Sequence, residues 1–165
     1  MTDHSSNPKR SPTRPGPGYT RFIAMIATST VAMYLLTYLN TYATDHIEFS
    51  ETRLYMALIM GAMMAAVMLL FMLGMYRSAK ANTTIILAAV AIFSGSLWLM
   101  RSQRLVGDVS YMRAMIPHHS IAILTSERAR IEDPRVRELA DGIIKTQREE
   151  IAEMQRYIKD LTGKN

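Results

Sequence analysis

The hydrophobic pattern divides this chain into an apolar part and a mixed polar part. Three long uncharged segments lie at about 22–42, 54–76 and 81–100, and each is close to the ~20 residues that a helix needs to cross a bilayer. Backbone groups in hydrocarbon must be hydrogen-bonded within the segment, so helices are expected. The first segment exceeds the ~7–15-residue core of a signal peptide, and we expect it to be retained. The sequence therefore predicts a three-span membrane domain over residues 21–100.

A different periodicity follows the last apolar segment. Apolar residues recur there at steps of three and four among charged residues, which predicts amphipathic helices at about 106–130 and 134–161. The second helix has Asp133 as its N-cap, proline at its first position, and Gly163 after its end. Its apolar positions are Val136, Ala140, Ile143, Ile151, Met154, Ile158 and Leu161. With the polar Gln147 included, they follow a coiled-coil-like spacing. Because the connection is short, residues 101–165 are expected to form an antiparallel hairpin.

A hairpin of two helices buries too little surface to be stable alone. We expect it either to pair with a second copy, which would complete a four-helix bundle, or to dock on the membrane domain.

The charge distribution gives the predicted membrane domain an orientation. The formal net charge is +5, but residues 101–165 are nearly balanced, with 12 Lys/Arg against 10 Asp/Glu, so no nucleic-acid partner is expected. Basic residues gather in the Pro- and Ser-rich tail of residues 1–20, which is expected to be disordered. Arg77 and Lys80 separate the second and third segments, whereas the loop after the first segment is acidic. The positive-inside rule then puts the tail in the cytoplasm and the hairpin outside.

Methionine and histidine are the candidate chemical groups of the hairpin. The chain has 14 methionines and no cysteine, so soft-metal chemistry would rest on thioethers and imidazoles. Met112, Met115 and His119 share one face of the first hairpin helix, and His118 lies on its flank. Thioethers select Cu(I) and the similar ion Ag(I), and imidazole also suits Cu(II) or Zn(II). The ordinary alternative is that methionines fill a core and that the histidines form a polar surface pair.

The position of the turn predicts which residues of the two hairpin helices meet. Folding about residue 132 sets Met112 opposite residues 151–154, and His119 opposite residues 144–147. Thioethers from both helices and one or two imidazoles then converge. A di-iron site would need Glu-x-x-His pairs, and the chain has none. Three glutamates of the second hairpin helix are expected to lie mostly off the seam and in solvent: Glu149, Glu150 and Glu153. No enzymatic activity is predicted.

Two runs of the hairpin resemble a known family. They are Tyr111-Met112-x-x-Met115-Ile116-Pro117-His118-His119-x-x-Ala122-Ile123 and Leu139-Ala140-x-x-Ile143-x-x-x-Gln147-x-x-Glu150-Ile151-x-x-Met154-x-x-Tyr157. Both are similar to the bacterial family called domain of unknown function 305, over about residues 105–162. The family is helical and ferritin-like, and some members resemble periplasmic copper- or silver-binding proteins. Where members often carry a further methionine, this chain has Thr125, which argues against a second metal centre on that side.

The resemblance implies an all-α fold in which the hairpin is a ferritin-like half-bundle, completed by homodimerisation. It also implies a bacterial inner-membrane protein with a periplasmic hairpin. The ion would be copper, as Cu(I) or Cu(II), or silver. The implied ligands are Met112, Met115, His118, His119 and Met154. Asp108, Gln147 and Glu150 are expected to lie around them.

A methionine stripe runs along the second apolar segment. It consists of Met56, Met60, Met64, Met68 and Met72, at a spacing of four residues. One hypothesis is a thioether ladder through which Cu(I) permeates the membrane. The favoured alternative is a packing face, since no charged group marks a conduction path and Gly61-x-x-x-Ala65 permits close helix approach. His46, in the first loop, is expected to be solvated.

The predicted function is a membrane-anchored extracytoplasmic binding protein for copper or silver, acting in sequestration, delivery or tolerance. Its predicted partners are the lipid bilayer, the metal ion and a second copy of the chain. The alternatives are a structural or adaptor hairpin without metal, and copper permeation along the methionine stripe.

Overall fold

The computed structural model describes residues 17–163, and no β-strand occurs among them. The elements are α1 (Pro17–Leu36), η1 (Thr44–His46), α2 (Glu51–Phe71), α3 (Ala79–Ser102), α4 (Asp108–Arg128) and α5 (Pro134–Thr162), where η1 is a short 3-10 helix. The first three α-helices are long and apolar enough to cross a membrane, and two further helices follow. The predicted all-α order of three apolar helices and a two-helix hairpin is therefore confirmed.

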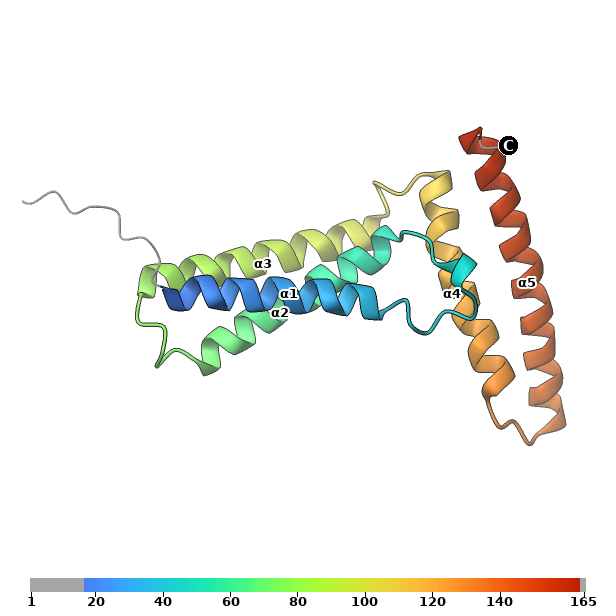
Figure 1. Ribbon diagram of the computed structural model, residues 1–165, viewed down its shortest axis with the longest axis horizontal. Coiled ribbons are helices and arrows are strands. Elements are labelled where there is room, and N and C mark those ends of the chain that lie inside the picture. The colour runs from blue at the N-terminus through green and yellow to red at the C-terminus, as the bar shows by residue number, and fades with distance from the viewer. Residues whose placement is uncertain (1–16, 164–165) are drawn as a thin grey trace, which may run out of the picture.

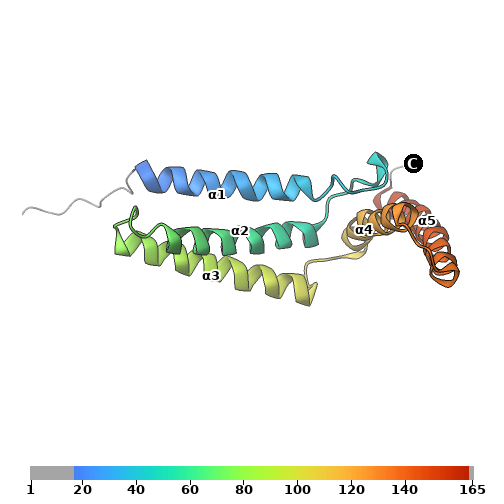
Figure 2. The same ribbon diagram turned by 90° about the horizontal axis from the view of Figure 1, so that it is seen from below.

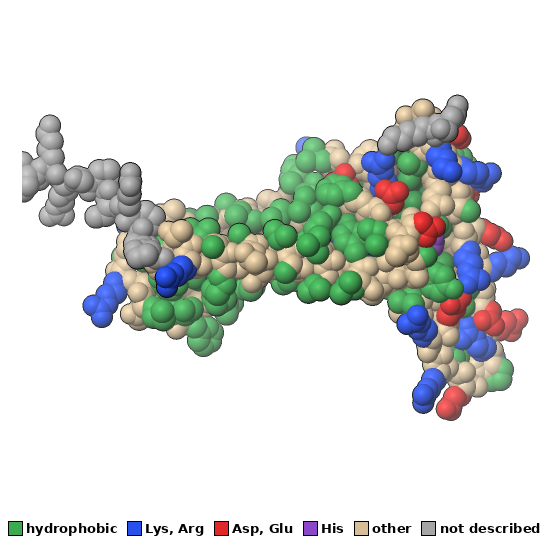
Figure 3. Space-filling view, viewed as in Figure 1, with side chains coloured by type: hydrophobic (Ala, Val, Ile, Leu, Met, Phe, Trp, Pro, Cys, Tyr) green, Lys and Arg blue, Asp and Glu red, His purple; other side chains and the backbone are tan. Residues whose placement is uncertain are grey.

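Helices α1, α2 and α3 lie side by side as one long arm, with α2 between the other two (Figures 1 and 2). The hairpin of α4 and α5 lies across one end of this arm, beside the connection from α1 to α2. Hydrophobic side chains cover the arm, whereas Lys, Arg, Asp and Glu gather on the hairpin (Figure 3). This separation of apolar and charged surface agrees with the division found along the sequence.

The ends of the apolar helices differ from the predicted ranges. Helix α1 already ends at Leu36 rather than near residue 42, where Thr37 and the residues after it form turns. Helices α2 and α3 begin earlier than expected, because the side chains of Ser50 and Ser78 cap them. Such polar caps lie outside an uncharged segment, so a criterion of apolarity misses them. Helix α2 also ends at Phe71 rather than near residue 76.

The predicted disordered tail covered residues 1–20. Residues 1–16 lie outside the described residues, and residues 17–20 belong to α1. The tail prediction was therefore wrong for its last four residues.

An aromatic cluster packs the three apolar helices together at the end of the arm away from the hairpin. Tyr19, Phe22, Leu69 and Tyr76 are buried there, and the rings of Tyr19 and Tyr76 have centroids 4.9 Å apart. The Tyr19 hydroxyl donates to the Asn82 side chain at 2.8 Å, which ties the start of α1 to α3. Aromatic contacts of this kind add specific geometry to the burial of apolar area.

Gly61 lets α1 approach α2 closely. A Cβ atom at this position would overlap Thr30 Oγ1 and lie 3.2 Å from Thr30 Cβ. The predicted role of Gly61 in close helix packing is therefore confirmed.

The α4–α5 hairpin is built around one buried apolar cluster: Met112, Ile116, Ile123, Ile151 and Ile158, with Ile144 and Met154 against it. Asp133 caps α5 by accepting from the Arg135 amide at 2.9 Å, and Gly163 ends it at φ 63°, so both signals are confirmed. The side-chain bond from Arg135 holds the pKa of the Asp133 carboxyl below its usual range.

The apolar face of α5 was only partly predicted. Ile144, not Ile143, packs into the cluster, and Val136, Ile143 and Leu161 are exposed. A strict seven-residue repeat drifts around a straight α-helix, so Val136 and Leu161, at the two ends of the predicted seam, turn away from α4. These exposed side chains leave α5 with an unpartnered apolar surface within the described chain.

The hairpin docks on the α1–α2 connection through α4. Ser120 is fully buried, and its hydroxyl accepts from the Tyr42 amide at 2.7 Å and lies 3.0 Å from His46 Nδ1. Ser110 donates to Glu51 at 2.7 Å. The expectation that His46 is a solvated loop residue was therefore wrong, because it is half-buried against α4. Docking on the apolar helices was one of two predicted ways to stabilise the hairpin; pairing with a second copy stays a prediction.

Gly61→Ala tests the close approach of α1 and α2. The added methyl group would overpack the contact with Thr30, which typically costs about 1–3 kcal/mol, so we expect a lower thermal unfolding midpoint in lipid nanodiscs. Adding Thr30→Ala should recover part of the loss. Gly95→Ala in α3 is the matched control, since a Cβ there meets no atom within 4 Å. Equal midpoints for Gly61→Ala and Gly95→Ala would contradict this account.

Candidate metal site

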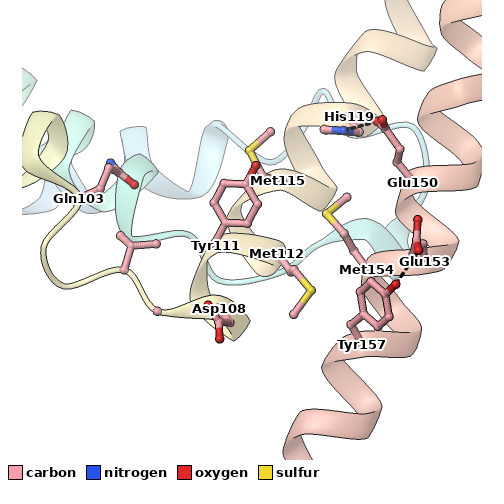
Figure 4. A pocket seen from close by; sticks show the side chains of 12 residues that line it. Gln103, Asp108, Tyr111, Met112, Met115, His119, Glu150, Glu153, Met154 and Tyr157 are labelled. Carbon is pink, nitrogen blue, oxygen red and sulfur yellow. Dashed lines mark hydrogen bonds and ion pairs between the residues drawn. The ribbon is translucent and has the colours of Figure 1, made fainter.

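A cavity of about 740 Å³ lies between α4, α5 and the connection from α3 to α4. Its lining includes the side chains of Met112, Met115, His119 and Met154 (Figure 4). Thus four of the five implied ligands line one cavity. His119 and Glu150 lie at one end of it, and Asp108 and Tyr157 lie towards the other.

The thioethers come from both helices. Met112 is buried in the hairpin cluster, and Met154 is half-buried against it. In Figure 4 the side chains of Met112 and Met154 extend into the space between α4 and α5, as the predicted pairing of residues 112 and 151–154 requires. Met112 and Met154 belong to the core as well as to the cavity lining. The interpretation as core methionines and the interpretation as ligands are therefore compatible in this structure.

His119 forms the shortest polar contact at its end of the cavity. Its Nε2 lies 2.7 Å from the Glu150 carboxylate, and its side chain is only 12% exposed. Its Nδ1 is buried and has no hydrogen-bond partner within the described chain. In a neutral imidazole whose Nε2–H donates to a carboxylate, Nδ1 carries the free lone pair. Such a carboxylate–histidine pair is the usual support of a metal-ligating histidine.

The partner of His119 differs from the prediction. Residue counting placed His119 opposite residues 144–147, yet it meets Glu150. Side chains on a helix lean towards its N-terminus, so in an antiparallel pair His119 and Glu150 lean towards each other along the hairpin. The expected solvation of Glu153 agrees with its exposed side chain, whereas Glu150 is half-buried. Both side chains line the cavity.

The supporting residues were predicted in part. Asp108 and Glu150 line the cavity, but Gln147 does not and instead lies in a shallow groove on the outer face of α5. Tyr157 and Glu153 were not predicted as a pair, although their four-residue spacing is a signal for contact on a helix. The Tyr157 hydroxyl donates to Glu153 at 2.7 Å, and this bond raises the pKa of Tyr157.

His118 does not join the other implied ligands. It is exposed on the side of α4 that faces the apolar helices, where it lines a second cavity of about 350 Å³. Its ring centroid is 6.0 Å from that of His119, and the two ring planes meet at 62°. Adjacent residues on a helix point about 100° apart, so a His-His pair is divided between two faces. Met115 is the one implied ligand that lines both cavities.

The charge of the first cavity suits a cation. Its lining holds the carboxylates of Asp108, Glu150 and Glu153 and no Lys or Arg. Within residues 17–163 there is no group of three or more His, Cys, Asp or Glu side chains placed to hold a metal ion together. A metal site in this cavity therefore depends on the thioethers.

The methionine stripe of α2 is not uniform in its surroundings. Met56 and Met60 are exposed, at 40% and 42%, and Met64 is half-buried. Met68 and Met72 pack against the aromatic cluster of the apolar helices. The packing interpretation thus agrees with the half of the stripe away from the hairpin. In the half near the hairpin, the side chains of Met56 and Met60 are exposed rather than packed.

Comparisons with known proteins agree with the resemblance of the hairpin. Residues 108–165 match the sequence model of the family described as domain of unknown function (DUF305). An uncharacterized protein of Acanthamoeba polyphaga mimivirus is 32% identical over 147 residues, which cover 87% of this chain and 94% of the viral protein. The chain belongs to the DUF305 family.

The likeness to the viral protein is longer than the DUF305 segment, so it extends into the apolar helices. Since this relative is viral, a bacterial membrane stays a prediction. No solved structure matches the chain.

The His119–Glu150 bond predicts one tautomer of the imidazole. Nitrogen-15 NMR of the full chain without added metal should show His119 with a protonated Nε2 and an unprotonated Nδ1. Glu150→Gln removes the carboxylate acceptor and should mix the two tautomers, whereas Glu149→Gln, an exposed neighbour, should not. A protonated Nδ1 in the unaltered chain would rule out the free lone pair.

Proposed function

We propose that this DUF305 protein is a membrane-anchored binding protein for Cu(I) or Ag(I), which it sequesters or hands over outside the cytoplasm. One observation carries the proposal. The Nδ1 atom of His119 is buried without a protein partner, and the His119 side chain lines a cavity together with Met112, Met115 and Met154. A buried nitrogen without a hydrogen bond is unfavourable by about 1–3 kcal/mol, which coordination of an ion would offset.

The donor set favours a soft monovalent ion. Thioethers are soft neutral ligands and imidazole is a borderline one, a combination that selects Cu(I) or Ag(I) over Mg²⁺ or Ca²⁺. Carboxylates such as Glu150 lie in the same cavity and would balance the charge of the ion without being its main ligands. A site without thiolates also suits an oxidising compartment, where exposed cysteines would form disulfides. The proposal is one of binding and transfer rather than catalysis.

The arrangement of the apolar helices supports an anchor with the hairpin outside. The hairpin and the α1–α2 connection lie at one end of the arm. The α2–α3 connection, with Arg77, lies at the other end, next to Lys80 at the start of α3. Cytoplasmic ends of membrane helices carry the excess of Lys and Arg. We therefore propose a cytoplasmic α2–α3 connection, with the hairpin on the periplasmic face of a bacterial inner membrane.

An adaptor function is the second candidate, and the surface of α5 favours it. Val136, Leu139 and Ile143 are exposed along one side of this helix. Exposed apolar patches on soluble surfaces commonly mark contacts with a protein partner. An adaptor hairpin would keep its fold and its partner without any metal, so metal binding separates the two functions.

Titration of the full chain in lipid nanodiscs with Ag(I) tests metal binding directly. The unaltered chain should bind Ag(I) by equilibrium dialysis, and His119→Ala or Met154→Leu should weaken the tightest binding at least about tenfold, since each removes a ligand. Met75→Leu is the control, because Met75 is 72% exposed at the far end of the arm. An unaltered chain that binds no Ag(I) refutes the proposed function and leaves the adaptor.

The orientation can be measured because the chain has no cysteine of its own. In intact bacterial cells without an outer membrane barrier, a membrane-impermeant maleimide should label Glu138→Cys in α5. Lys80→Cys, at the start of α3, should react only after the membrane is permeabilised. Both positions are exposed, so a difference reports the side of the membrane. The reverse labelling pattern would show that the hairpin is cytoplasmic.

A further inference from the structure

The second cavity joins the apolar helices to the hairpin. It lies where α4 crosses the end of the arm, and its lining comes from α4, from α2 and from the residues that flank α1. Among the lining side chains are three possible soft-metal donors: Met56 of α2, and Met115 and His118 of α4. They come from segments about 60 residues apart in the sequence, so no local helical spacing accounts for their meeting.

We infer that this junction is a second, weaker binding site for Cu(I) or Ag(I), from which the ion passes to the hairpin cavity. The inference rests on the proposed function and adds Met56, which lies outside the DUF305 segment, as a ligand. Two thioethers and one imidazole are neutral soft and borderline donors, the same chemistry as in the first cavity. Met56 is also the residue of the methionine stripe nearest the hairpin, and its side chain is 40% exposed.

Met115 provides the connection between the two sites. It lines both cavities, whereas His118 lines only the junction and Met112 only the hairpin cavity. An ion held by Met115 could therefore exchange Met56 and His118 for Met112 and His119 while Met115 stays bound to it. This step is an exchange of coordination bonds: no electron is transferred, the ion keeps its charge, and the thioethers and neutral imidazoles release no proton.

Electrostatics gives the transfer a direction. Arg53 lines the junction and is 94% buried. Its guanidinium donates to the Thr37 carbonyl, and the guanidinium carbon lies 4.4 Å from the centroid of the Tyr38 ring. No Asp or Glu lines this cavity, whereas three carboxylates line the hairpin cavity. A cation is thus repelled at the junction and attracted in the hairpin, and both effects are stronger at low local dielectric. The junction should hold the ion more weakly and pass it towards His119.

The test uses the full chain in nanodiscs with Ag(I) as the probe. Equilibrium dialysis gives the stoichiometry and the two affinities, and NMR of carbon-13-labelled methionine methyl groups reports each site separately. We expect a tight ion and a weaker ion, with the Met56 methyl signal shifting only as the weaker ion binds. Met56→Leu and His118→Gln should remove the weaker ion or weaken it at least about tenfold, and should leave the tight one unchanged.

Three further variants make the outcome specific. Met154→Leu should weaken the tight ion only, and Met115→Leu should weaken both. Met60→Leu is the matched control, since Met60 is one helical turn from Met56, equally exposed and outside the cavity lining, and we expect no change in binding.

The proposed site at the junction is refuted if Met56→Leu and His118→Gln leave both Ag(I) affinities unchanged. It is also refuted if Met60→Leu weakens Ag(I) binding as strongly as Met56→Leu does. Those results would leave the hairpin site standing. If the unaltered chain binds no Ag(I), the proposed function and the junction fail together. A weaker ion that survives Met56→Leu but is lost in Met154→Leu would place the second ion within the hairpin and would also overturn the junction.

Discussion

The buried hydroxyl of Ser120 fixes how α4 is turned about its own axis, and both cavities depend on that rotation. Its contacts with the Tyr42 amide and with His46 hold one face of α4 against the α1–α2 connection. His119 then faces α5, and His118 faces the apolar helices. A rotation by one residue, about 100°, would put His118 where His119 now lies and move His119 off the side that faces α5. The hydrogen bonds of Ser120 therefore determine which cavity His118 and His119 each line.

The hydrophobic pattern was sufficient for the architecture because hydrocarbon leaves the backbone almost no choice. Uncharged segments of membrane-spanning length predicted α1, α2 and α3, and Asp133 and Gly163 predicted the limits of α5. The exact ends of the apolar helices could not be predicted in this way, since they depend on polar caps such as Ser50 and on turns after Leu36. Close packing at Gly61 was predictable from small-residue spacing, but its contact with Thr30 was not.

The site was predicted less completely, for a geometric reason. Periodicity places Met112, Met115 and His119 on one face of α4, which agrees with the hairpin cavity. It cannot tell which residue of α5 an imidazole reaches, because that depends on the lean of both side chains. Glu150 was therefore expected near the ligands, but not as the hydrogen-bond partner of His119. The meeting of Met56 with His118 depends on tertiary docking and leaves no trace in local spacing.

The outward apolar residues of α5 have a consequence for the hairpin as a separate molecule. In the full chain one side of the hairpin is covered by the α1–α2 connection, where Ser120 is fully buried. Severed from α1–α3, the hairpin would expose that docking face in addition to Val136, Leu139 and Ile143. The hydroxyls of Ser110 and Ser120 would then lose their partners Glu51 and Tyr42, while the apolar side chains of α5 would stay exposed. The DUF305 segment of this chain thus finds partners for polar groups on one of its faces in the connection between α1 and α2 and in the first turn of α2.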